Sequence, residues 1–307
     1  MLLGGTGPDD RRGTEGPSHW LHWGGRERTT LGPAHWLRCF DPKCNGWGQL
    51  EDIEVERGIP CGAAAIGSYL YAFGVLVDIG LHGDQEPGCM TRFDMAGCQM
   101  AEVAGPPSVL SHCAGVACGG RVYSLGGWSY EGSVADVSTY IPDIDWWGAG
   151  PALPSTVFGM AAAEHMGAIY ACGGWKAGNR DHASPALLML DPRTRVWSAL
   201  PAMSNTPATY EGAAGVGGVG AAVVSGRLYV PGSDHSGHAG GTLWCYDVAA
   251  GRWDTGCAPM AEERCSLAVA ALQGEVWAVG GGSHGPLATV EVYSPRLNTW
   301  RAGVPLP

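Results

Sequence analysis

Histidine and acidic residues occur together in several short segments that are rich in glycine and alanine. Imidazole and carboxylate groups of this kind can ligate a divalent metal. The set comprises Asp181, His182, Asp234, His235, His238 and His284. However, the chain has no His-Glu-x-x-His sequence, and polar residues are also common in loops that bind nothing. We therefore expect no metal centre.

The run at 215–220 has the spacing Gly-x-Gly-x-x-Gly, which can hold the phosphates of a dinucleotide. That use requires a strand before the run and a helix after it. Residues 221–229 instead read as a strand, a tight turn and a second strand. The chain also lacks the phosphate-binding Gly-x-x-x-x-Gly-Lys-Ser/Thr loop and the Gly-x-Ser-x-Gly turn of serine hydrolases. We expect no cofactor, no catalytic residues and no enzymatic activity.

The 11 cysteines are odd in number and scattered, with no Cys-x-x-Cys, so their pattern indicates no disulfide framework. Cys113 with Cys118, or Cys257 with Cys265, could form redox-sensitive thiol pairs. No cation that would lower a thiol pKa is evident near the first pair, and Cys265 follows Arg264 but also two glutamates. We expect buried, reduced core thiols, in a protein of the cytoplasm or, alternatively, the nucleus.

The composition favours an all-β fold with many turns. Glycine (50) and proline (21) are abundant in the 307 residues, and both are poor helix formers. Charged residues make up only 15%, whereas the hydrophobic fraction is 45% and includes 13 tryptophans. That apolar content is enough for a large core and excludes disorder over most of the length.

Charge and hydropathy argue against two classes of partner. The net charge of −11 argues against binding to a nucleic-acid backbone. The N-terminus has neither the basic nor the apolar region of a signal peptide. The uncharged stretch 61–77 is interrupted by a Gly-Ser turn and is shorter than a membrane span. We expect neither nucleic acid nor membrane as a partner.

An internal repeat predicts the fold. Six residues recur at intervals of 47 to 56, and a large apolar residue precedes each of them by seven positions. The pairs are Phe40 with Trp47, Phe93 with Met100, Tyr140 with Trp147, Leu190 with Trp197, Tyr246 with Trp253 and Tyr293 with Trp300. Upstream of three of the pairs, an apolar run ends in a double glycine, at 126–127, 173–174 and 280–281. Weaker versions of that run lie at 72–75 and 230–233.

Each part of the repeat has a structural explanation. The apolar run reads as a strand, and the glycines let the backbone turn out of it with positive φ. The apolar-to-tryptophan unit reads as a hairpin, often with a proline that presets the turn. Segments such as 265–272 are rich in small residues, which suit an innermost strand near a central axis. Four strands per unit cannot cover both of their faces, so the units must stack and close into a ring.

This combination of four strands, a period near 50, a double glycine, a tyrosine and a tryptophan resembles the Kelch repeat. The resemblance covers nearly the whole chain and implies one domain over 1–307, an all-β, six-bladed Kelch β-propeller with four antiparallel strands per blade. Trp253-Asp254 does not indicate a WD40 array, whose period is shorter. The expected blades are 1–50, 51–103, 104–150, 151–200, 201–256 and 257–307.

The sequence of blade 1 allows two assignments of its second strand. Residues 1–5 can be the end of its second strand, which makes 6–34 a long loop, and we favour this reading. Alternatively, residues 20–25 are that strand, which fits the usual spacing from glycine to aromatic residue better. In neither reading does an innermost strand precede it. We therefore expect a propeller cut from a longer protein, or one whose closure is incomplete.

In Kelch propellers, the loops that follow the double glycines share a face with the connections between blades, and adaptors of this family hold a peptide or protein there. Carried over by position, the partner-binding residues implied by the resemblance are Trp128, Ser129, Tyr130, Trp175, Lys176, Asp234, His235, Ser283 and His284. Tryptophan and tyrosine are common anchors of protein interfaces.

The same loops and connections carry 16 acidic and 5 basic residues, and the rest of the chain is balanced. The segments counted are 48–59, 75–91, 101–110, 128–137, 148–157, 175–187, 198–212, 233–242, 254–264, 282–290 and 301–307. Either these charges only solvate the loops, or they favour a neutral or basic ligand. An arginine-rich pocket that would bind an acidic peptide is not evident on this face.

The resemblance implies a protein-interaction domain, most specifically the substrate-recognition propeller of a Kelch-like adaptor for a cullin-RING ubiquitin ligase. In such adaptors, BTB and BACK domains precede the propeller and link it to the ligase, and neither is visible in these 307 residues. A second possibility is a cytoskeletal or scaffolding protein that binds actin or an assembly partner without ubiquitination. The third and weakest is an enzyme, because some Kelch propellers are copper oxidases or sugar epimerases.

Overall fold

The computed structural model describes most of the chain. The described residues are 2–3, 20–24, 28–29, 32–33, 35–53, 61–74, 88, 90–108, 110–129, 131–176, 179–203, 220–232, 240–282 and 286–307. For residues 2–38, 49–53 and 179–183, the description covers the backbone only. Among the described residues, no helix is long and apolar enough to cross a membrane.

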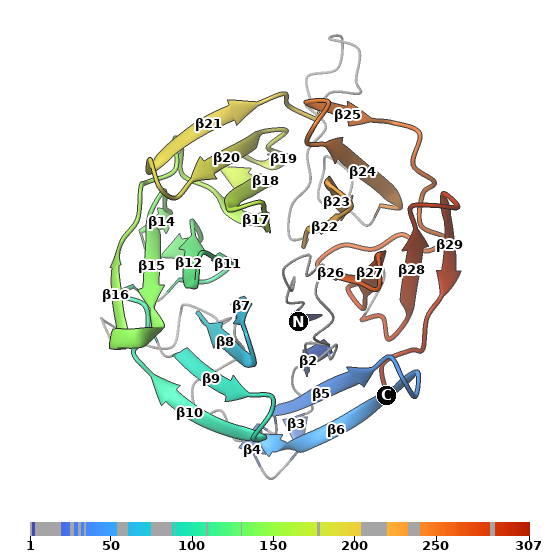
Figure 1. Cartoon of the computed structure of the whole chain (residues 1–307), viewed down its shortest axis with the longest axis horizontal. Helices are drawn as coiled ribbons and strands as arrows, with labels where there is room; N and C mark the ends of the chain where they lie inside the picture. Colours follow the sequence, from blue (N-terminus) through green and yellow to red (C-terminus); the bar gives the residue numbers. More distant parts are fainter. Residues whose placement is uncertain are drawn as a thin grey trace.

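The structure is an all-β propeller of antiparallel, four-stranded blades arranged around a central axis (Figure 1). The first two sheets run through β1 (Leu2–Leu3), β2 (Trp20–Gly24), β5 (His35–Asp41) and β6 (Gly46–Ile53), and through β7 (Gly62–Ile66), β8 (Tyr69–Phe73), β9 (Met90–Asp94) and β10 (Gln99–Val103). The next two run through β11 (Ala114–Cys118), β12 (Arg121–Leu125), β15 (Val137–Ile141) and β16 (Trp146–Ala149), and through β17 (Phe158–His165), β18 (Ala168–Lys176), β20 (Leu187–Asp191) and β21 (Val196–Leu200). The last two run through β22 (Ala222–Val224), β23 (Arg227–Gly232), β24 (Thr242–Asp247) and β25 (Arg252–Asp254), and through β26 (Ala268–Leu272), β27 (Glu275–Val279), β28 (Val290–Ser294) and β29 (Thr299–Ala302).

Shorter elements extend this framework. A fifth strand, β19 (Asn179–Ala183), pairs with β18, so that five sheets have four strands and one has five. Two small hairpins are formed by β3 (Arg28–Thr29) with β4 (Gly32–Pro33), and by β13 (Trp128–Ser129) with β14 (Gly132–Ser133). A 3-10 turn spans Pro142–Ile144. Because one sheet carries a fifth strand, the expected ring of six blades with four strands each is not confirmed.

The structure corrects the favoured reading of the first sheet. The second strand is β2, in which Trp20 lies opposite Phe40, just as Val122 lies opposite Tyr140 in a regular sheet. Residues 2–3 form β1, which pairs with β2 and occupies the innermost position that we expected to be empty. The spacing from glycine to aromatic residue was therefore the better guide, because it reflects the hydrogen-bonded register between the second and third strands.

The six residue pairs of the repeat lie directly opposite one another across the third and fourth strands. This register holds for Phe40 with Trp47, Phe93 with Met100, Tyr140 with Trp147, Leu190 with Trp197, Tyr246 with Trp253 and Tyr293 with Trp300. In the all-aromatic pairs, the ring centroids are 5.1 to 5.3 Å apart. A separation of seven residues is therefore the signature of a hairpin whose two ends pack against each other.

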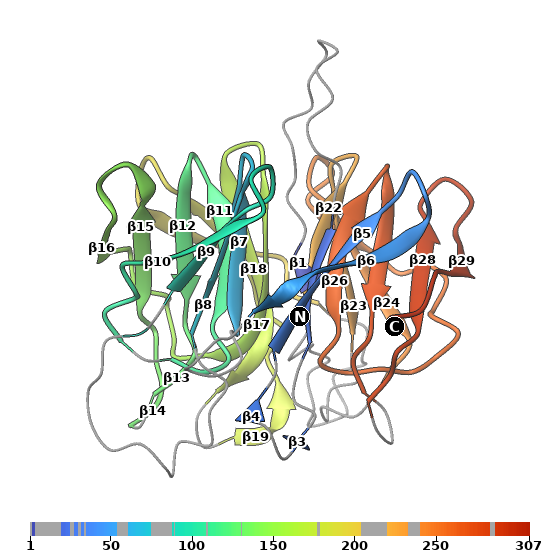
Figure 2. The same cartoon turned by 90° about the horizontal axis from the view of Figure 1, so that it is seen from below.

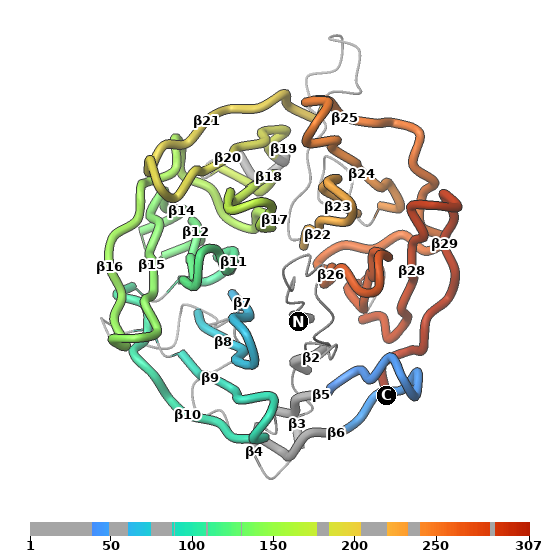
Figure 3. Tube along the Cα trace, viewed as in Figure 1, coloured from blue at the N-terminus to red at the C-terminus, as the bar shows by residue number. Residues whose placement is uncertain are grey.

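The tryptophans also join neighbouring sheets. In each case the indole Nε1–H donates to a backbone carbonyl just after the fourth strand of the preceding sheet. The pairs are Trp147 with Ala104, Trp197 with Pro151, Trp253 with Pro201 and Trp300 with Ala258, at 2.7 to 2.8 Å. Trp47 makes the same bond, 3.0 Å long, to Val304 after the last strand, where β5 and β6 lie beside the C-terminal end of the chain (Figure 3). This bond joins the first sheet to the last.

Small residues line the central axis. A narrow channel of about 70 Å³ is lined by segments of β7, β11, β17, β22 and β26, mainly alanines. At Gly115 in β11, an added Cβ would lie 2.3 Å from the backbone nitrogen of Ala63. Neighbouring inner strands approach too closely there for a larger side chain, as the composition of these segments predicts.

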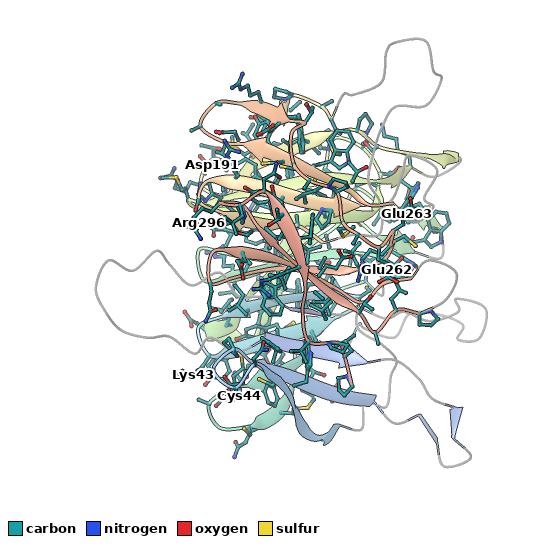
Figure 4. All side chains as sticks on the ribbon, turned by 90° about the vertical axis from the view of Figure 1, so that its right-hand side faces the viewer. Lys43, Cys44, Asp191, Glu262, Glu263 and Arg296 are labelled. Atoms are coloured by element: carbon teal, nitrogen blue, oxygen red, sulfur yellow. The ribbon has the colours of Figure 1, made fainter. Side chains whose placement is uncertain are left out.

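The propeller has two faces. The turns that follow the first and third strands of the sheets lie on one, which we call the hairpin face. The small hairpins β3–β4 and β13–β14 and strand β19 extend from the other, which we call the loop face (Figure 2). Figure 4 shows Lys43, Cys44, Asp191 and Arg296 on the hairpin face, and Glu262 and Glu263 on the opposite side.

Candidate functional site

Three aromatic rings form a cluster at the loop face. Trp128 in β13 packs edge-on against Phe158 at the start of β17, with ring centroids 5.0 Å apart and an angle of 80°. Trp175, opposite Phe158 on β18, lies 5.7 Å from the same ring. All three side chains are half-buried. The two tryptophans that the sequence placed in equivalent loops are therefore brought together by a phenylalanine between them.

The backbone fixes Trp128 by two hydrogen bonds. The Trp128 N–H donates to the Ser111 carbonyl at 2.7 Å, and the Ser111 N–H donates to the Trp128 carbonyl at 2.9 Å. The preceding residue, Gly127, has a φ of +122°, and a Cβ there would lie 2.9 Å from the Ser111 oxygen. The double glycine is therefore needed so that the chain can leave β12 and pass close to the connection that precedes β11.

The other predicted partner-binding residues lie in different surroundings. The Ser129 hydroxyl accepts the Glu131 N–H and donates to the Gly132 carbonyl, so it stabilises the β13–β14 turn. Lys176 is exposed at the end of β18, where the register with β19 shifts. The remaining candidates lie outside the described residues: Tyr130, Asp234, His235, Ser283 and His284. The possible metal ligand His238 lies outside them as well, and Asp181 and His182 are described by backbone only.

Sequence reasoning missed Phe158 and His112. The His112 ring lies 6.1 Å from the Phe158 ring, its Nδ1 is 3.2 Å from the Ser111 hydroxyl, and desolvation lowers its pKa. Phe158 had one available signal, a large aromatic residue at the start of an inner strand that is otherwise alanine-rich. His112 had none, because only the fold brings the connection before β11 next to β17.

The cysteine pairs suggested by the sequence are not those that the fold brings together. The Cys113 Sγ lies 3.3 Å from that of Cys61, and a hydrogen bond between the two thiols raises the pKa of Cys113 and lowers that of Cys61. Burial raises the pKa of Cys118 to about 11.

Cys257 hydrogen-bonds Cys245, and this bond lowers the pKa of Cys257 to about 7. Cys265 instead donates to the Gly282 carbonyl at 3.3 Å. Thus Cys113 and Cys118 are buried as expected, whereas Cys257 and Cys265 are only half-buried.

The charges assigned to the loop face are not all there. Asp254 pairs with Arg227 at 3.3 Å, beside the β22–β23 turn on the hairpin face. The Arg264 side chain is fully buried and bonds Glu291 at 2.9 Å and Glu262 at 3.0 Å. It also donates to the carbonyls of Gly280 and Thr289. Arg264 therefore acts as an internal brace between the connection 255–267 and the last sheet, rather than as a surface charge.

Comparison with known proteins agrees with this architecture. The Kelch motif matches residues 263–307. The chain is 31% identical to human Kelch-like protein 33 over 48% of its own length and 27% of the relative. It is 25% identical to bovine Kelch-like protein 36 over 87% of its length and 43% of the relative, and 23% identical to Kelch-like protein terF of Aspergillus terreus over 80% and 56%. In each case it spans less than two thirds of the relative.

Among solved structures, that of YjhT superposes with a TM-score of 0.63 at 15% identity, covering 82% of this chain and 86% of the other, which shows the fold alone. The motif, the relatives and the four-stranded blades together show a Kelch-repeat β-propeller that resembles the C-terminal domain of Kelch-like proteins. The similarity to Kelch-like proteins suggests a protein-interaction domain.

Proposed function

We propose that this propeller is a non-enzymatic recognition domain whose loop face holds a peptide or protein. The observation that carries the proposal is the cluster of Trp128, Phe158 and Trp175, whose half-buried rings come from two adjacent sheets. Such rings offer a rigid apolar surface, the usual anchor of a protein interface. The loops around the cluster favour a neutral or basic ligand through their acidic residues.

The finer proposal is that the domain selects substrates for a cullin-RING ubiquitin ligase, through BTB and BACK domains outside these 307 residues. It is supported by the similarity to Kelch-like proteins. The scaffold alternative differs in its outcome, because binding to actin or an assembly partner would not lead to ubiquitination.

We further propose that the blades form a complete ring of six, which the six hydrogen-bonded sheets support. We also propose that the protein is located in the cytoplasm or nucleus.

The test is partner capture from a cell lysate, read by mass spectrometry, with the wild-type domain and the double variant Trp128→Ala/Trp175→Ala. Trp146→Ala is a matched control, because that tryptophan is 55% exposed on the opposite face. We expect the double variant to lose partners that the wild type and the control retain, while its Tm stays within a few degrees. Equal capture by all three proteins would refute a loop-face site.

Ubiquitination of the captured proteins, assayed in cells with the longer parent protein, separates the adaptor from the scaffold. Co-sedimentation of the domain with actin filaments tests the scaffold reading directly. Neither measurement depends on a catalytic residue in the propeller.

A further inference from the structure

A groove opens between the β7–β10 and β11–β16 sheets on the hairpin face. It has a volume of about 560 Å³ and is lined by residues from the turns and strand ends of both sheets. The lining includes Ile66, Tyr69, Arg92, Arg121, Ile141 and Asp143. The aromatic cluster of Trp128 lies on the other face of the ring, so this groove is a separate feature of the molecule.

Two guanidinium groups give the groove a positive character. The Arg92 guanidinium carbon lies 4.9 Å above the centre of the Tyr69 ring, which orients the group without neutralising it. Arg121 is exposed at the start of β12. In the described part of the chain, neither arginine forms an ion pair. Asp143 is the single acidic residue of the lining, so the groove carries a net positive charge in a chain whose net charge is −11.

The floor and rim are suited to an apolar contact beside the charges. Tyr71 lies opposite Arg92 in register, and burial raises the pKa of its phenol despite the nearby guanidinium. The phenol is therefore neutral. Tyr69 is 36% exposed, and Ile66 and Ile141 add apolar side chains to the lining. Exposed apolar side chains next to unpaired cations are typical of a surface that a partner covers.

We propose that this groove binds an acidic peptide segment of a partner protein, with carboxylates on Arg92 and Arg121 and an apolar side chain against Tyr69. Guanidinium and carboxylate match in geometry and form charge-assisted hydrogen bonds. The charge complementarity is local, because the rest of the protein repels an acidic ligand. The inference does not depend on the loop-face site, and it adds a second surface with the opposite preference.

The probe is a fluorescein-labelled nonapeptide of alternating glutamate and leucine, compared with the same peptide carrying glutamine in place of glutamate. Binding is measured by fluorescence anisotropy with the full 307-residue chain. We expect the acidic peptide to bind and the glutamine peptide to bind at least about tenfold more weakly, which corresponds to ~1.4 kcal/mol. Affinity should fall as ionic strength rises through about 0.15 M, because screening then acts within roughly 8 Å.

The variants Arg92→Gln and Arg121→Gln should each weaken binding several-fold, and the double variant at least about tenfold. Arg193→Gln is the matched control, since that arginine is 90% exposed in the β20–β21 turn, away from the groove. Arg121→Lys should retain part of the affinity, because it keeps the charge but loses the planar fork. Thermal unfolding identifies any variant that loses binding by losing its fold.

Several outcomes would overturn the proposal. One is equal binding of the two peptides, and another is a loss in Arg193→Gln as large as in the double variant. A third is no binding of the acidic peptide at all. Binding of anionic phosphatidylserine vesicles without peptide binding would assign the groove to a lipid surface instead. Concentration-dependent self-association that the double variant abolishes would assign it to a second copy of this chain.

Discussion

The two faces of the propeller are made by the same repeat but differ in chemistry. On the hairpin face, short turns place a residue with positive φ at equivalent positions, such as Asn45, Asp145 and Asn298. The side chains of Asp145 and Asn298 accept backbone N–H groups from the connections that leave the neighbouring sheets. On the loop face, the described glycines with positive φ that follow second strands include Gly74, Gly127 and Gly281. The chain forms the β13–β14 hairpin after Gly127, whereas β18 continues through its glycines and pairs with β19. Over the described residues, the hairpin face is therefore regular in backbone, and the loop face is not.

This difference separates residues that join the sheets of the ring from residues that form the proposed binding surfaces. The tryptophans of the fourth strands recur and join neighbouring sheets, so they have a structural role. Phe158 and Arg92 do not recur, and Arg121, unlike its counterpart Arg227 in β23, forms no ion pair among the described residues. Their contacts create an aromatic cluster on one face and a positive groove on the other. The two proposed binding surfaces therefore depend on departures from the repeat.

The largest effect should come from the buried brace behind the loop face. Arg264→Ala leaves the Glu291 carboxylate buried without its cation, so we expect a loss of about 3–5 kcal/mol in the free energy of unfolding, measured by urea denaturation. Arg301→Ala is the control: this arginine is 55% exposed and pairs with Glu275, and its loss should cost less than about 1 kcal/mol.

Arg264→Met combined with Glu291→Gln should recover part of that loss, because no unpaired charge remains in the interior. If Arg264→Ala were no more destabilising than Arg301→Ala, the brace would contribute nothing to the fold. The loop face would then depend only on its own turns.

Gly127→Ala should separate the two faces. The alanine would need a φ of +122° and would place its Cβ 2.9 Å from the Ser111 oxygen, so we expect a cost of about 1–3 kcal/mol and displacement of Trp128. Partner capture at the loop face should fall, whereas binding of the acidic peptide on the hairpin face should stay unchanged in anisotropy measurements.

Gly167→Ala is the matched control for that variant. It also has a positive φ (+79°), but no atom lies within 4 Å of the added Cβ in the β17–β18 turn. It should lower stability by about 1 kcal/mol or less and leave loop-face capture intact. Loss of both activities in Gly127→Ala would indicate that the two faces are not independent.

Trp47→Phe tests the bond that joins the first sheet to the last. It removes the donor to the Val304 carbonyl while keeping most of the aromatic contact with Phe40, so we expect a loss of about 1 kcal/mol in the free energy of unfolding. Trp146→Phe, on the exposed side of the hairpin face, should have no measurable effect. Equal stability of the two variants would mean that ring closure depends on other contacts.

The sequence predicted what the repeat encodes and little of what depends on tertiary neighbours. The pairs from Phe40 with Trp47 to Tyr293 with Trp300 gave the hairpins and their register, because both members lie on one local unit. The first sheet was harder to predict, since β1 has only two paired residues and the double glycine that follows it, Gly4-Gly5, resembles the end of a second strand. The contact between Cys61 and Cys113 spans 52 residues, and that between Trp128 and Phe158 crosses two sheets. No local pattern records either contact.

The smallest expected effect concerns the reactivity of two thiols, Cys257 and Cys118, which lie in different surroundings. The hydrogen bond from Cys245 lowers the pKa of Cys257 to about 7, whereas burial raises that of Cys118, at the end of β11 on the hairpin face, to about 11. Alkylation of Cys257 by iodoacetamide should therefore rise through pH 7, while Cys118 stays unmodified below about pH 9. Peptide mapping by mass spectrometry measures the alkylated fraction of both cysteines.

The variant Cys245→Ala tests the cause. It should move the pH midpoint of Cys257 alkylation to higher pH, because the donor that stabilises the Cys257 thiolate is removed. An unchanged midpoint in Cys245→Ala would show that other groups set the reactivity of Cys257.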